Sequence, residues 1–395
     1  MPRPPGLIPW GRYDRSKGRT SSLNNWIEIS EANLTHNFRV LQAAAGDTTE
    51  IVAVVKANAY GHGVEICSAM LARAGAMWLG VTCASEGVRA RAAVGDSNIH
   101  IVIMCGFLPE DVPLILLHGL TPVVWTLEQV AWLEGNPGLR VHIEVDTGMG
   151  RQGAVPGHDL DKLLNRIVQA KMVAEGIFTH FCSSEVANSA LTRHQQRLFE
   201  GAVAQAQAAG VQPDWVHAGN SSALDNPAQV TPWLAHLAAS VNARAMVRTG
   251  LALYGYCLPI DGDARPHVQP DLRPVMTWKA HVLSVRSLAA GDTVGYNATF
   301  TAQRPTRVAL LPVGYADGLR RELSYPSGWV MLHGQRAQVL GRVSMNLTVV
   351  DVTAIEAVAT GDEAILLGEG ITADQHAKLA HTIAYEIVCG VHPCG

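Results

Sequence analysis

The sequence predicts a (β/α)8 barrel of the TIM type, followed by a C-terminal domain of β-strands. Eight short apolar segments, each typical of a buried strand, recur between residues 50 and 255. Alanine-rich segments with helical periodicity lie between most of them, and strands that alternate with helices over about 220 residues are typical of this barrel. After about residue 272, short alternating segments are separated by turns rich in glycine, aspartate and proline, which indicates an all-β domain.

The barrel strands are predicted from largely apolar segments of five to seven residues, which are separated by turn signals. They lie at residues 51–55, 77–81, 99–104, 121–125, 139–145, 172–178, 214–219 and 245–250. The segments GVEICSAMLARAGA and ALTRHQQRLFEGAVAQAQAAG are examples of the helices between them. A doubly wound sheet is the structural alternative, but the first strand is not followed by the GxGxxG turn of its dinucleotide-binding version.

The later strands are predicted in VMTWKAHVLSV, TRVALLPVG, GWVMLHGQRAQVLGRVSMNLTVVDV and DEAILLG. These patterns divide the chain into an N-terminal arm at residues 1–23, a barrel at 24–258 and a β domain at 259–395. A first strand at about 25–31 is a candidate member of either domain. The arm is rich in proline, glycine and arginine and is predicted to be flexible.

Composition excludes several classes of protein. Of the 395 residues, 48% are hydrophobic and 16% charged, and the net charge is −4 without a lysine/arginine block, which argues against nucleic-acid binding. No segment approaches the roughly 18 apolar residues of a membrane span, and the N-terminus lacks the apolar core of a signal peptide. The seven cysteines follow no CxxC spacing. We therefore expect a cytoplasmic protein with free thiols and no metal site.

The segment IVAVVKANAYGHG, residues 51–63, places a lysine at the end of the first barrel strand. Active sites of such barrels lie at the C-terminal ends of the strands, and Val52, Val54 and Lys56 share one face because side chains alternate. A lysine in a partly dry pocket can form a Schiff base with a carbonyl group. The structural alternative is a rim lysine that extends to water.

The segment VHIEVDTGMGRQG, residues 141–153, alternates apolar residues with His142, Glu144 and Asp146. The apolar set is expected to pack under the helices, which leaves the three polar side chains inside the barrel. Buried polar groups need partners, and Arg151 on the following loop is the predicted one. A purely structural network of ion pairs is the alternative.

Three further segments fall at predicted strand ends. They contain His180 in FTHF, Asn220 and Ser221 in HAGNSSA, and Arg248 and Gly250 in MVRTGLALYGY. Small residues with free backbone amides can bind a phosphate group, and a phosphate site after the late strands is frequent in this fold. Each segment taken alone is also compatible with a plain turn.

These motifs together resemble those of alanine racemases that depend on pyridoxal phosphate, from about residue 24 to residue 390. VVKANAYGHG is similar to the family's cofactor-lysine motif, DTGMGRQG to its arginine motif and RTGLALYGY to the motif that closes its barrel. VGYNATF, LPVGYADG, GRVSMN and AYEIVCG resemble successive landmarks of its C-terminal domain. The order and spacing of the motifs, rather than any single one, identify the resemblance.

The resemblance implies a role for each matching residue. Lys56 would carry pyridoxal 5′-phosphate covalently, Arg248 would face the pyridine nitrogen, and Arg151 would contact the phenolic oxygen and the substrate. The positions that match phosphate ligands are Tyr60, Ser221, Gly250, Leu251 and Tyr385, and those that match residues around the ring are His180 and Asn220. A guanidinium does not give up its proton at ordinary pH, so the ring nitrogen should stay unprotonated, which would suppress transamination.

Racemisation requires acid/base groups on both faces of the carbon that loses its proton. The resemblance implies Lys56 on one face and Tyr296 on the other, with His180 and Arg248 as a relay that lowers the pKa of the phenol. Tyr296 would come from the β domain of a second subunit. Met345 and Tyr315 of that domain match a residue that binds the substrate carboxylate and one that narrows the entrance. The implied enzyme is a homodimer with composite sites that supplies D-alanine for peptidoglycan.

Three positions depart from the family pattern. Glu144 stands where many members have a lysine that becomes carbamylated, and we hypothesise that its carboxylate replaces the carbamate and holds Arg151. Ser344 and Asn346 stand where cysteine and aspartate are common, and the change at Asn346 removes a negative charge near the substrate. This pattern also resembles the broad-specificity amino-acid racemases for serine, lysine and arginine, which typically carry a signal peptide.

Three other functions are alternatives. Fold-type III amino-acid decarboxylases share both domains, but they need a cysteine motif where this chain reads GRVSMNLTVVD. Non-catalytic carriers of pyridoxal phosphate resemble the barrel alone and lack a β domain. A binding module without chemistry would leave Lys56 without a role.

Overall fold

A computed structural model describes residues 24–95, 97–226, 230–262 and 265–393. The predicted N-terminal arm, residues 1–23, lies outside the described residues. The described residues divide into two compact units, one within residues 31–273 and one formed by residues 24–30 with 274–393, which are called the barrel unit and the β unit here. Residues 259–273, placed with the β domain in the sequence analysis, belong to the barrel unit. No helix of the described residues is long and apolar enough to cross a membrane.

The barrel unit is a closed barrel of eight parallel strands, which confirms the predicted fold class. The strands are β2 (Thr49–Val54), β3 (Trp78–Val81), β4 (His100–Ile103), β5 (Thr121–Val124), β6 (Arg140–Val145), β7 (Val173–Thr179), β8 (Trp215–His217) and β9 (Arg244–Thr249). Each strand pairs in parallel with the next, and β9 closes the barrel against β2. The strand bounds lie within a few residues of the predicted apolar runs, because only those runs can be buried on both faces.

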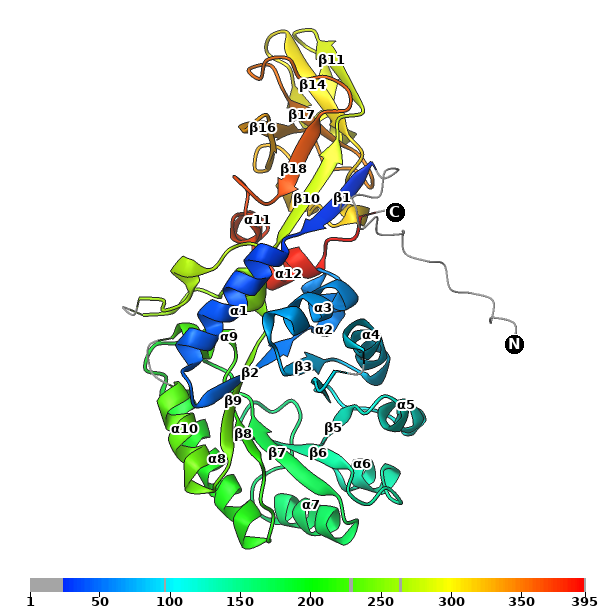
Figure 1. Cartoon of the computed structure of the whole chain (residues 1–395). Coiled ribbons are helices and arrows are strands. Elements are labelled where there is room, and N and C mark those ends of the chain that lie inside the picture. Colours follow the sequence, from blue (N-terminus) through cyan, green and yellow to red (C-terminus); the bar gives the residue numbers. More distant parts are fainter. Residues whose placement is uncertain (1–23, 96, 227–229, 263–264, 394–395) are drawn as a thin grey trace, which may run out of the picture. The chain divides into compact units, whose positions relative to one another are not determined.

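Helices cover the outside of the barrel strands (Figure 1). They are α1 (Glu31–Ala45), α3 (Val64–Ala74), α4 (Ala84–Val94), α5 (Val112–Leu117), α6 (Leu127–Trp132), α7 (His158–Gln169), α8 (Ala190–Ala208) and α10 (Val230–Ser240), with 3-10 turns η1 (Pro109–Asp111), η2 (Leu251–Tyr254) and η3 (Gln269–Asp271). The short segments α2 (Lys56–Tyr60), which is left-handed after Lys56, and α9 (Ser221–Asp225) instead belong to the loops that follow β2 and β8. Buried side chains that alternate along the strands form a cluster of Val52, Trp78, Val102, Val123, Phe178, Trp215 and Met246. This packed interior fixes the strand ends from which the candidate site projects.

The β unit contains an eight-stranded sheet in the order β1-β10-β18-β15-β16-β17-β14-β11. Its strands are β1 (Asn25–Ile29), β10 (Met276–His281), β11 (Ser284–Leu288), β14 (Thr306–Leu311), β15 (Trp329–Leu332), β16 (Gln335–Leu340), β17 (Thr348–Asp351) and β18 (Glu363–Leu367). A small sheet of β12 (Thr293–Val294) and β13 (Phe300–Thr301), the turns η4 (Tyr296–Ala298), η5 (Tyr315–Asp317) and η6 (Arg321–Leu323), and the helices α11 (Ala373–Leu379) and α12 (Ala384–Cys389) complete the unit. Strand β1 pairs antiparallel with β10, so the first described strand belongs to this sheet.

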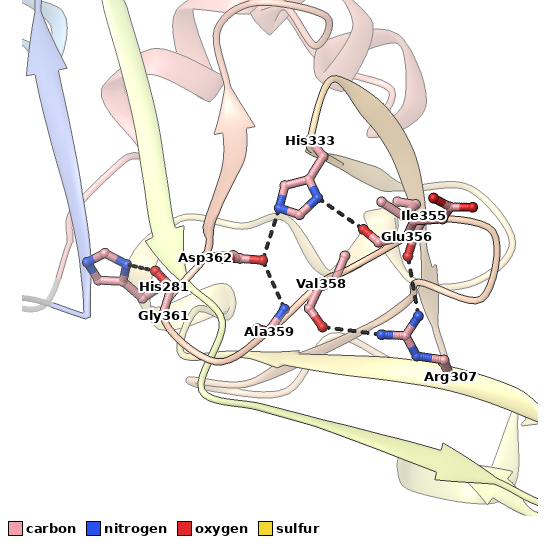
Figure 2. A network of polar contacts seen from close by, with 9 residues as sticks. All are labelled: His281, Arg307, His333, Ile355, Glu356, Val358, Ala359, Gly361 and Asp362. Atoms are coloured by element: carbon pink, nitrogen blue, oxygen red, sulfur yellow. Dashed lines mark hydrogen bonds and ion pairs between the residues drawn. The ribbon is translucent and has the colours of Figure 1, made fainter.

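Figure 2 shows how a long turn of the β unit is held by side chains rather than by strand pairing. Arg307 donates to two carbonyl groups of the turn 353–360, over 3.4 and 3.2 Å. The carboxylate of Asp362 accepts the Ala359 amide over 2.9 Å and lies 2.9 Å from Nε2 of His333. Backbone groups outside regular structure still need partners, and these polar side chains provide them.

Candidate active site

The chain makes a left-handed turn directly after Lys56. Ala57, Asn58, Ala59 and Tyr60 have φ angles of 53–55°. Left-handed backbone costs about 1–2 kcal/mol per residue for residues with a side chain, and several in a row persist only where their surroundings hold them. The turn ends at Gly61, whose φ is 84°. Lys56 thus stands at the C-terminal end of β2, before a strained and defined loop.

Two buried side chains hold this turn. Glu86 accepts the backbone amides of Asn58 and Thr82 over 2.7 and 2.8 Å. Nδ1 of His62 lies 3.0 Å from the carbonyl oxygens of both Ala59 and Tyr60, so Nδ1 must carry a proton. Burial lowers the pKa of His62 to about 4, and the ring is neutral at ordinary pH. His62 of the lysine motif therefore helps to fix the backbone next to Lys56.

The predicted phosphate segments meet at Ser221. Its hydroxyl accepts the amides of Gly250 and Ala252, each over 3.1 Å, and Asn220 caps α9 by accepting the Ala223 amide over 3.1 Å. Gly250 has no side chain, and a Cβ atom there would overlap the hydroxyl of Tyr60. The glycine therefore lets the Tyr60 hydroxyl approach the start of η2.

The prediction of free amides at these segments is correct only in part. The Gly250 amide is not free, because the Ser221 hydroxyl occupies it. The amides of Ser221 and Leu251 donate to no other group of the described residues. Both come first in short helical segments, α9 and η2, where backbone amides have no intrahelical acceptor. Both donors thus remain available for an anion.

Arg248 lies inside the barrel, 3% exposed. Its Nη2 donates to the Thr179 carbonyl over 2.8 Å and lies 3.2 Å from Nδ1 of His180, while its Nη1 lies 3.3 Å from Nδ1 of His217. Its Nε has no partner among the described residues. Burial lowers the pKa of Arg248 to about 10, against the opposing charge of Glu144, so the guanidinium keeps its proton at neutral pH.

His180 is surrounded by positive charge. Burial is the largest cause that lowers its pKa, to about 3, and the charges of Arg248, Arg151 and Lys56 add to it. The ring is therefore neutral. Because a guanidinium can only donate, Nδ1 of His180 accepts from Arg248 and Nε2 carries the proton. The predicted pair of His180 and Arg248 is present within the barrel unit.

The arginine motif differs from the prediction at Arg151 and Asp146. His142 and Glu144 face the barrel interior as predicted, 0% and 2% exposed. Asp146 instead accepts the amides of its own loop, from Gly148 to Gly150. It is Gln152, not Arg151, that donates to the Glu144 carboxylate.

The physical reason for this correction lies in the loop that Asp146 folds. That loop carries Gln152 back to Glu144 and to the Met104 carbonyl, 2.9 Å away, and leaves Arg151 exposed. No ion pair joins Arg151 to another described residue. Burial raises the pKa of Glu144 to about 7, although the Gln152 hydrogen bond and the charges of Arg248 and Arg151 oppose the shift.

The predicted site residues of the β unit are mostly exposed. Tyr296, Met345 and Tyr315 are 69%, 56% and 43% exposed. The loops of the last two are joined, because the amides of Tyr315 and Ala316 donate to the carbonyls of Ser344 and Met345 over 3.1 and 2.9 Å. Tyr296 begins η4, in which the next two residues have positive φ. Tyr385 lies on α12.

Several side chains that shape this site were not predicted from the sequence. Glu86, Gln152, His62 and His217 were not singled out, although each contacts a predicted residue or its loop. Gln152 directly follows Arg151 in the sequence. Both residues lie on the loop after β6, so the alternation of side chains along that strand does not predict which of the two points into the barrel. Glu86 gave no sequence signal, since a glutamate in the first turn of a helix is ordinary.

Comparison with known proteins extends to both units. Residues 29–258 match the family model of the alanine racemase N-terminal domain, and residues 275–394 match that of the C-terminal domain. The "Alanine racemase" of Symbiobacterium thermophilum is 37% identical over 376 residues, which cover 93% of this chain and 94% of that protein. The "Alanine racemase" of Methylacidiphilum infernorum is 34% identical over 386 residues, with coverage of 93% and 90%.

Solved structures show the same likeness. Alanine racemase from Clostridium difficile 630 has a TM-score of 0.83 at 26% identity, with coverage of 94% of both chains. That from Streptomyces coelicolor A3(2) has a TM-score of 0.80 at 29% identity, covering 94% of this chain and 96% of the other. Alanine racemase from Bartonella henselae, described with covalently bound pyridoxal phosphate, has a TM-score of 0.77 at 27% identity, covering 93% and 97%.

Proposed function

The chain belongs to the alanine racemase family, as its sequence motifs predicted, and on that premise we propose how it interconverts L- and D-alanine. Membership makes it an isomerase that depends on pyridoxal 5′-phosphate. The proposal concerns what its own residues do: Lys56 and Tyr296 exchange the proton at Cα on opposite faces, and a second copy of the chain completes the site.

The residues of the barrel unit fit this cofactor. Its phosphate is an anion, and the Ser221 and Leu251 amides at the starts of α9 and η2 are unpaired donors beside the Tyr60 hydroxyl. The positive charges of Lys56, Arg151 and Arg248 gather around His180, and among the described residues the Lys56 ammonium has no ion-pair partner. When bound, the cofactor withdraws electrons from Cα and acidifies its hydrogen.

Two positioned bases follow from the geometry that racemisation demands. The proton must leave Cα on one face and return on the other, so no single group can do both. In this proposal Lys56 serves one face, and the strained turn after β2 supports this role because it fixes the backbone next to Lys56. Arg248 is oriented by Thr179 and His180 and in this proposal faces the pyridine nitrogen. Its retained proton keeps that nitrogen a hydrogen-bond acceptor.

The exposure of Tyr296, Met345 and Tyr315 supports a site shared between two copies of the chain. A phenol that acts as a base needs a partly dry environment with nearby cations, and in the single chain the Tyr296 ring lies mostly in water. In the proposed homodimer it enters the partner's barrel, where the cations around His180 would stabilise the phenolate. Arg151 and the Met345 amide would then bind the substrate carboxylate, and Tyr315 would narrow the entrance.

We further propose that the protein supplies D-alanine for peptidoglycan in the cytoplasm. In this proposal Tyr385 completes the phosphate site and Asn220 contacts the ring. The single observation that carries the function is the placement of Lys56: it follows a barrel strand and lies with Arg151 and Arg248 in a cluster of cations around His180.

The test is chiral chromatography of L-alanine, L-serine, L-lysine and L-arginine after incubation with the holoenzyme. Lys56→Ala and Tyr296→Phe are assayed in parallel, in both directions. Conversion mainly of alanine, abolished in the first variant and strongly impaired in the second, is the expected result. Comparable conversion of the basic substrates would favour the broad-specificity racemase, which the loss of a charge at Asn346 supports. Absence of any D-amino acid would refute the function.

A further inference from the structure

A chain of buried polar side chains runs through the barrel interior from Arg248. Its members lie on four consecutive strands: His142 on β6, Glu175 on β7, His217 on β8 and Arg248 on β9. Nη1 of Arg248 lies 3.3 Å from Nδ1 of His217, whose Nε2 lies 3.0 Å from Nδ1 of His142. Nε2 of His142 lies 3.5 Å from Oε2 of Glu175. None of the four is more than 3% exposed.

The chemistry of the two end residues, Glu175 and Arg248, determines which atom donates and which accepts at each contact between them. An ionised carboxylate only accepts hydrogen bonds and a guanidinium only donates them. Glu175 therefore requires the proton of His142 on Nε2, which leaves Nδ1 of His142 as an acceptor. That acceptor requires the proton of His217 on Nε2, and Nδ1 of His217 is then free to accept from Arg248. Burial holds the pKa of His217 well below its usual value, so a doubly protonated ring is excluded.

A β-bulge places Glu175 at the end of this chain. In the pairing of β6 with β7, Val141 pairs with Ala174 but His142 pairs with Gly176, so Glu175 has no partner in the register. Bulges bend a strand and redirect a side chain. A Cβ atom on Gly176 would lie 2.7 Å from Nδ1 of the His142 ring, so only glycine leaves room for that ring.

The carboxylate at the far end is ionised. Its Oε1 accepts from Nη1 of Arg140 over 2.6 Å. Burial opposes ionisation of Glu175, but the contacts with His142 and Arg140 outweigh it, and the pKa lies below its ordinary value. Oε2 of Glu175 and Nε2 of His142 form no hydrogen bond with any described residue, and their 3.5 Å separation makes the contact between them electrostatic rather than a well-formed hydrogen bond.

We propose that Glu175 is a positioning residue for Arg248: through His142 and His217 it fixes the proton positions on both rings, so that His217 presents an acceptor and orients the guanidinium. The identity of the group that Arg248 faces, the cofactor ring, rests on the proposed function. The proton positions do not, because they are a property of the protein without cofactor.

The test measures the proton positions on the two histidine rings and the affinity for the cofactor. Long-range ¹H–¹⁵N correlation spectra of histidine-labelled apoprotein report which ring nitrogen carries the proton, and His142→Asn and His217→Asn variants assign the signals. Titration with pyridoxal 5′-phosphate, followed by its visible absorption, gives the dissociation constant. The variant is Glu175→Gln, whose amide both donates and accepts and so no longer requires a proton on one nitrogen. The matched control is Asp214→Asn. It removes a carboxylate that lies 3.4 Å from the same Arg140 but that does not belong to the series of contacts from Glu175 to Arg248.

We expect both rings of the wild type to be protonated on Nε2, and Glu175→Gln to show a second tautomer and about tenfold weaker cofactor binding, the scale of one lost charge-assisted hydrogen bond. Asp214→Asn should change neither. A wild-type ring protonated on Nδ1 would overturn the proposal even if the variant does not fold. Unchanged tautomers in a folded Glu175→Gln protein would overturn it as well. The expected tautomers in a protein that does not racemise alanine would refute the proposed function alone.

Discussion

The two units present their candidate site residues in opposite ways. In the barrel unit Arg248, Ser221 and Glu144 are at most 3% exposed, and each is held by hydrogen bonds to neighbouring strands or loops. In the β unit Tyr296 and Met345 are more than half exposed. In the proposed function, folding of one chain positions the cofactor-binding half of the site, while the exposed side chains of the other half are buried only by a second copy of the chain.

The largest expected effect tests whether the two halves come from different chains. Lys56→Ala and Tyr296→Phe homodimers should each be nearly inactive. Mixing them under conditions that exchange subunits should restore about a quarter of wild-type activity, because a mixed dimer of composite sites has one intact site. Activity is measured as D-alanine formation against time after mixing. Failure to recover any activity, once exchange is confirmed by differently tagged subunits, would place both bases in the same chain.

A smaller effect on activity is expected from a substitution that tests the close packing of Gly250 against Tyr60 in the barrel unit. Gly250→Ala should displace the Tyr60 ring and lower kcat/KM by about a hundredfold, the scale of a misplacement near 1 Å. The matched control is Gly201→Ala on α8, where a Cβ atom meets nothing within 4 Å. There alanine should raise the free energy of unfolding by about 0.5–1 kcal/mol, since it is the better helix former. Equal activity of the two variants would show that Tyr60 does not need the space.

Glu144 makes the stability of the barrel unit depend on pH. Burial raises its pKa from 4.5 to about 7, so the folded state binds this proton more tightly than the unfolded state. Stability from this group is therefore complete below pH 4.5 and is lost as the pH rises through 7. Relative to Glu144→Gln, the wild-type apoprotein should lose about 3 kcal/mol of unfolding free energy across this range. Urea unfolding of both proteins at several pH values measures the difference.

The same variant tests the hypothesis that Glu144 replaces a carbamate. Loss of its charge should weaken cofactor binding and slow turnover, because Gln152 and the nearby Arg151 and Arg248 then face a neutral group. Unchanged affinity and turnover in Glu144→Gln would show that the carboxylate has no such role. Gln152→Ala is the companion variant, since it removes the donor and keeps the charge.

The smallest effect is expected in the β unit. His333 and Asp362 form a hydrogen bond, and their side chains are 39% and 28% exposed (Figure 2). Exposed pairs contribute about 0–1 kcal/mol, so His333→Phe should lower the free energy of unfolding by less than about 1 kcal/mol and leave racemisation unchanged. A large loss of activity would show that the turn 353–360 shapes the site. Urea unfolding and the chiral assay check both statements.

Sequence patterns predicted those features of the barrel unit that depend on neighbouring residues in the chain. Apolar runs identified the eight strands because a parallel strand is buried on both faces, and the motif spacing placed Lys56 at a strand end. The alternation along residues 141–145 also predicted that His142 and Glu144 face inward. These properties depend only on neighbours along the chain.

Contacts between distant segments were not predictable in the same way. Glu86 holds the turn after Lys56 from 28 residues away, and β1 joins a strand about 250 residues later. The choice of Gln152 over Arg151 as the donor to Glu144 depended on how Asp146 folds its loop. The bulge at Glu175 depended on the register of β7 against β6.

The sequence by itself determined the elements, their order and the residue types at the strand ends, because hydrophobic periodicity and backbone preference act over a few residues. Only the tertiary structure decided which polar groups share the barrel interior and which of their protons face one another. Hydrogen bonds between strands require atoms placed to within a few tenths of an ångström. That placement is fixed by register and packing, which no local pattern in this chain encodes.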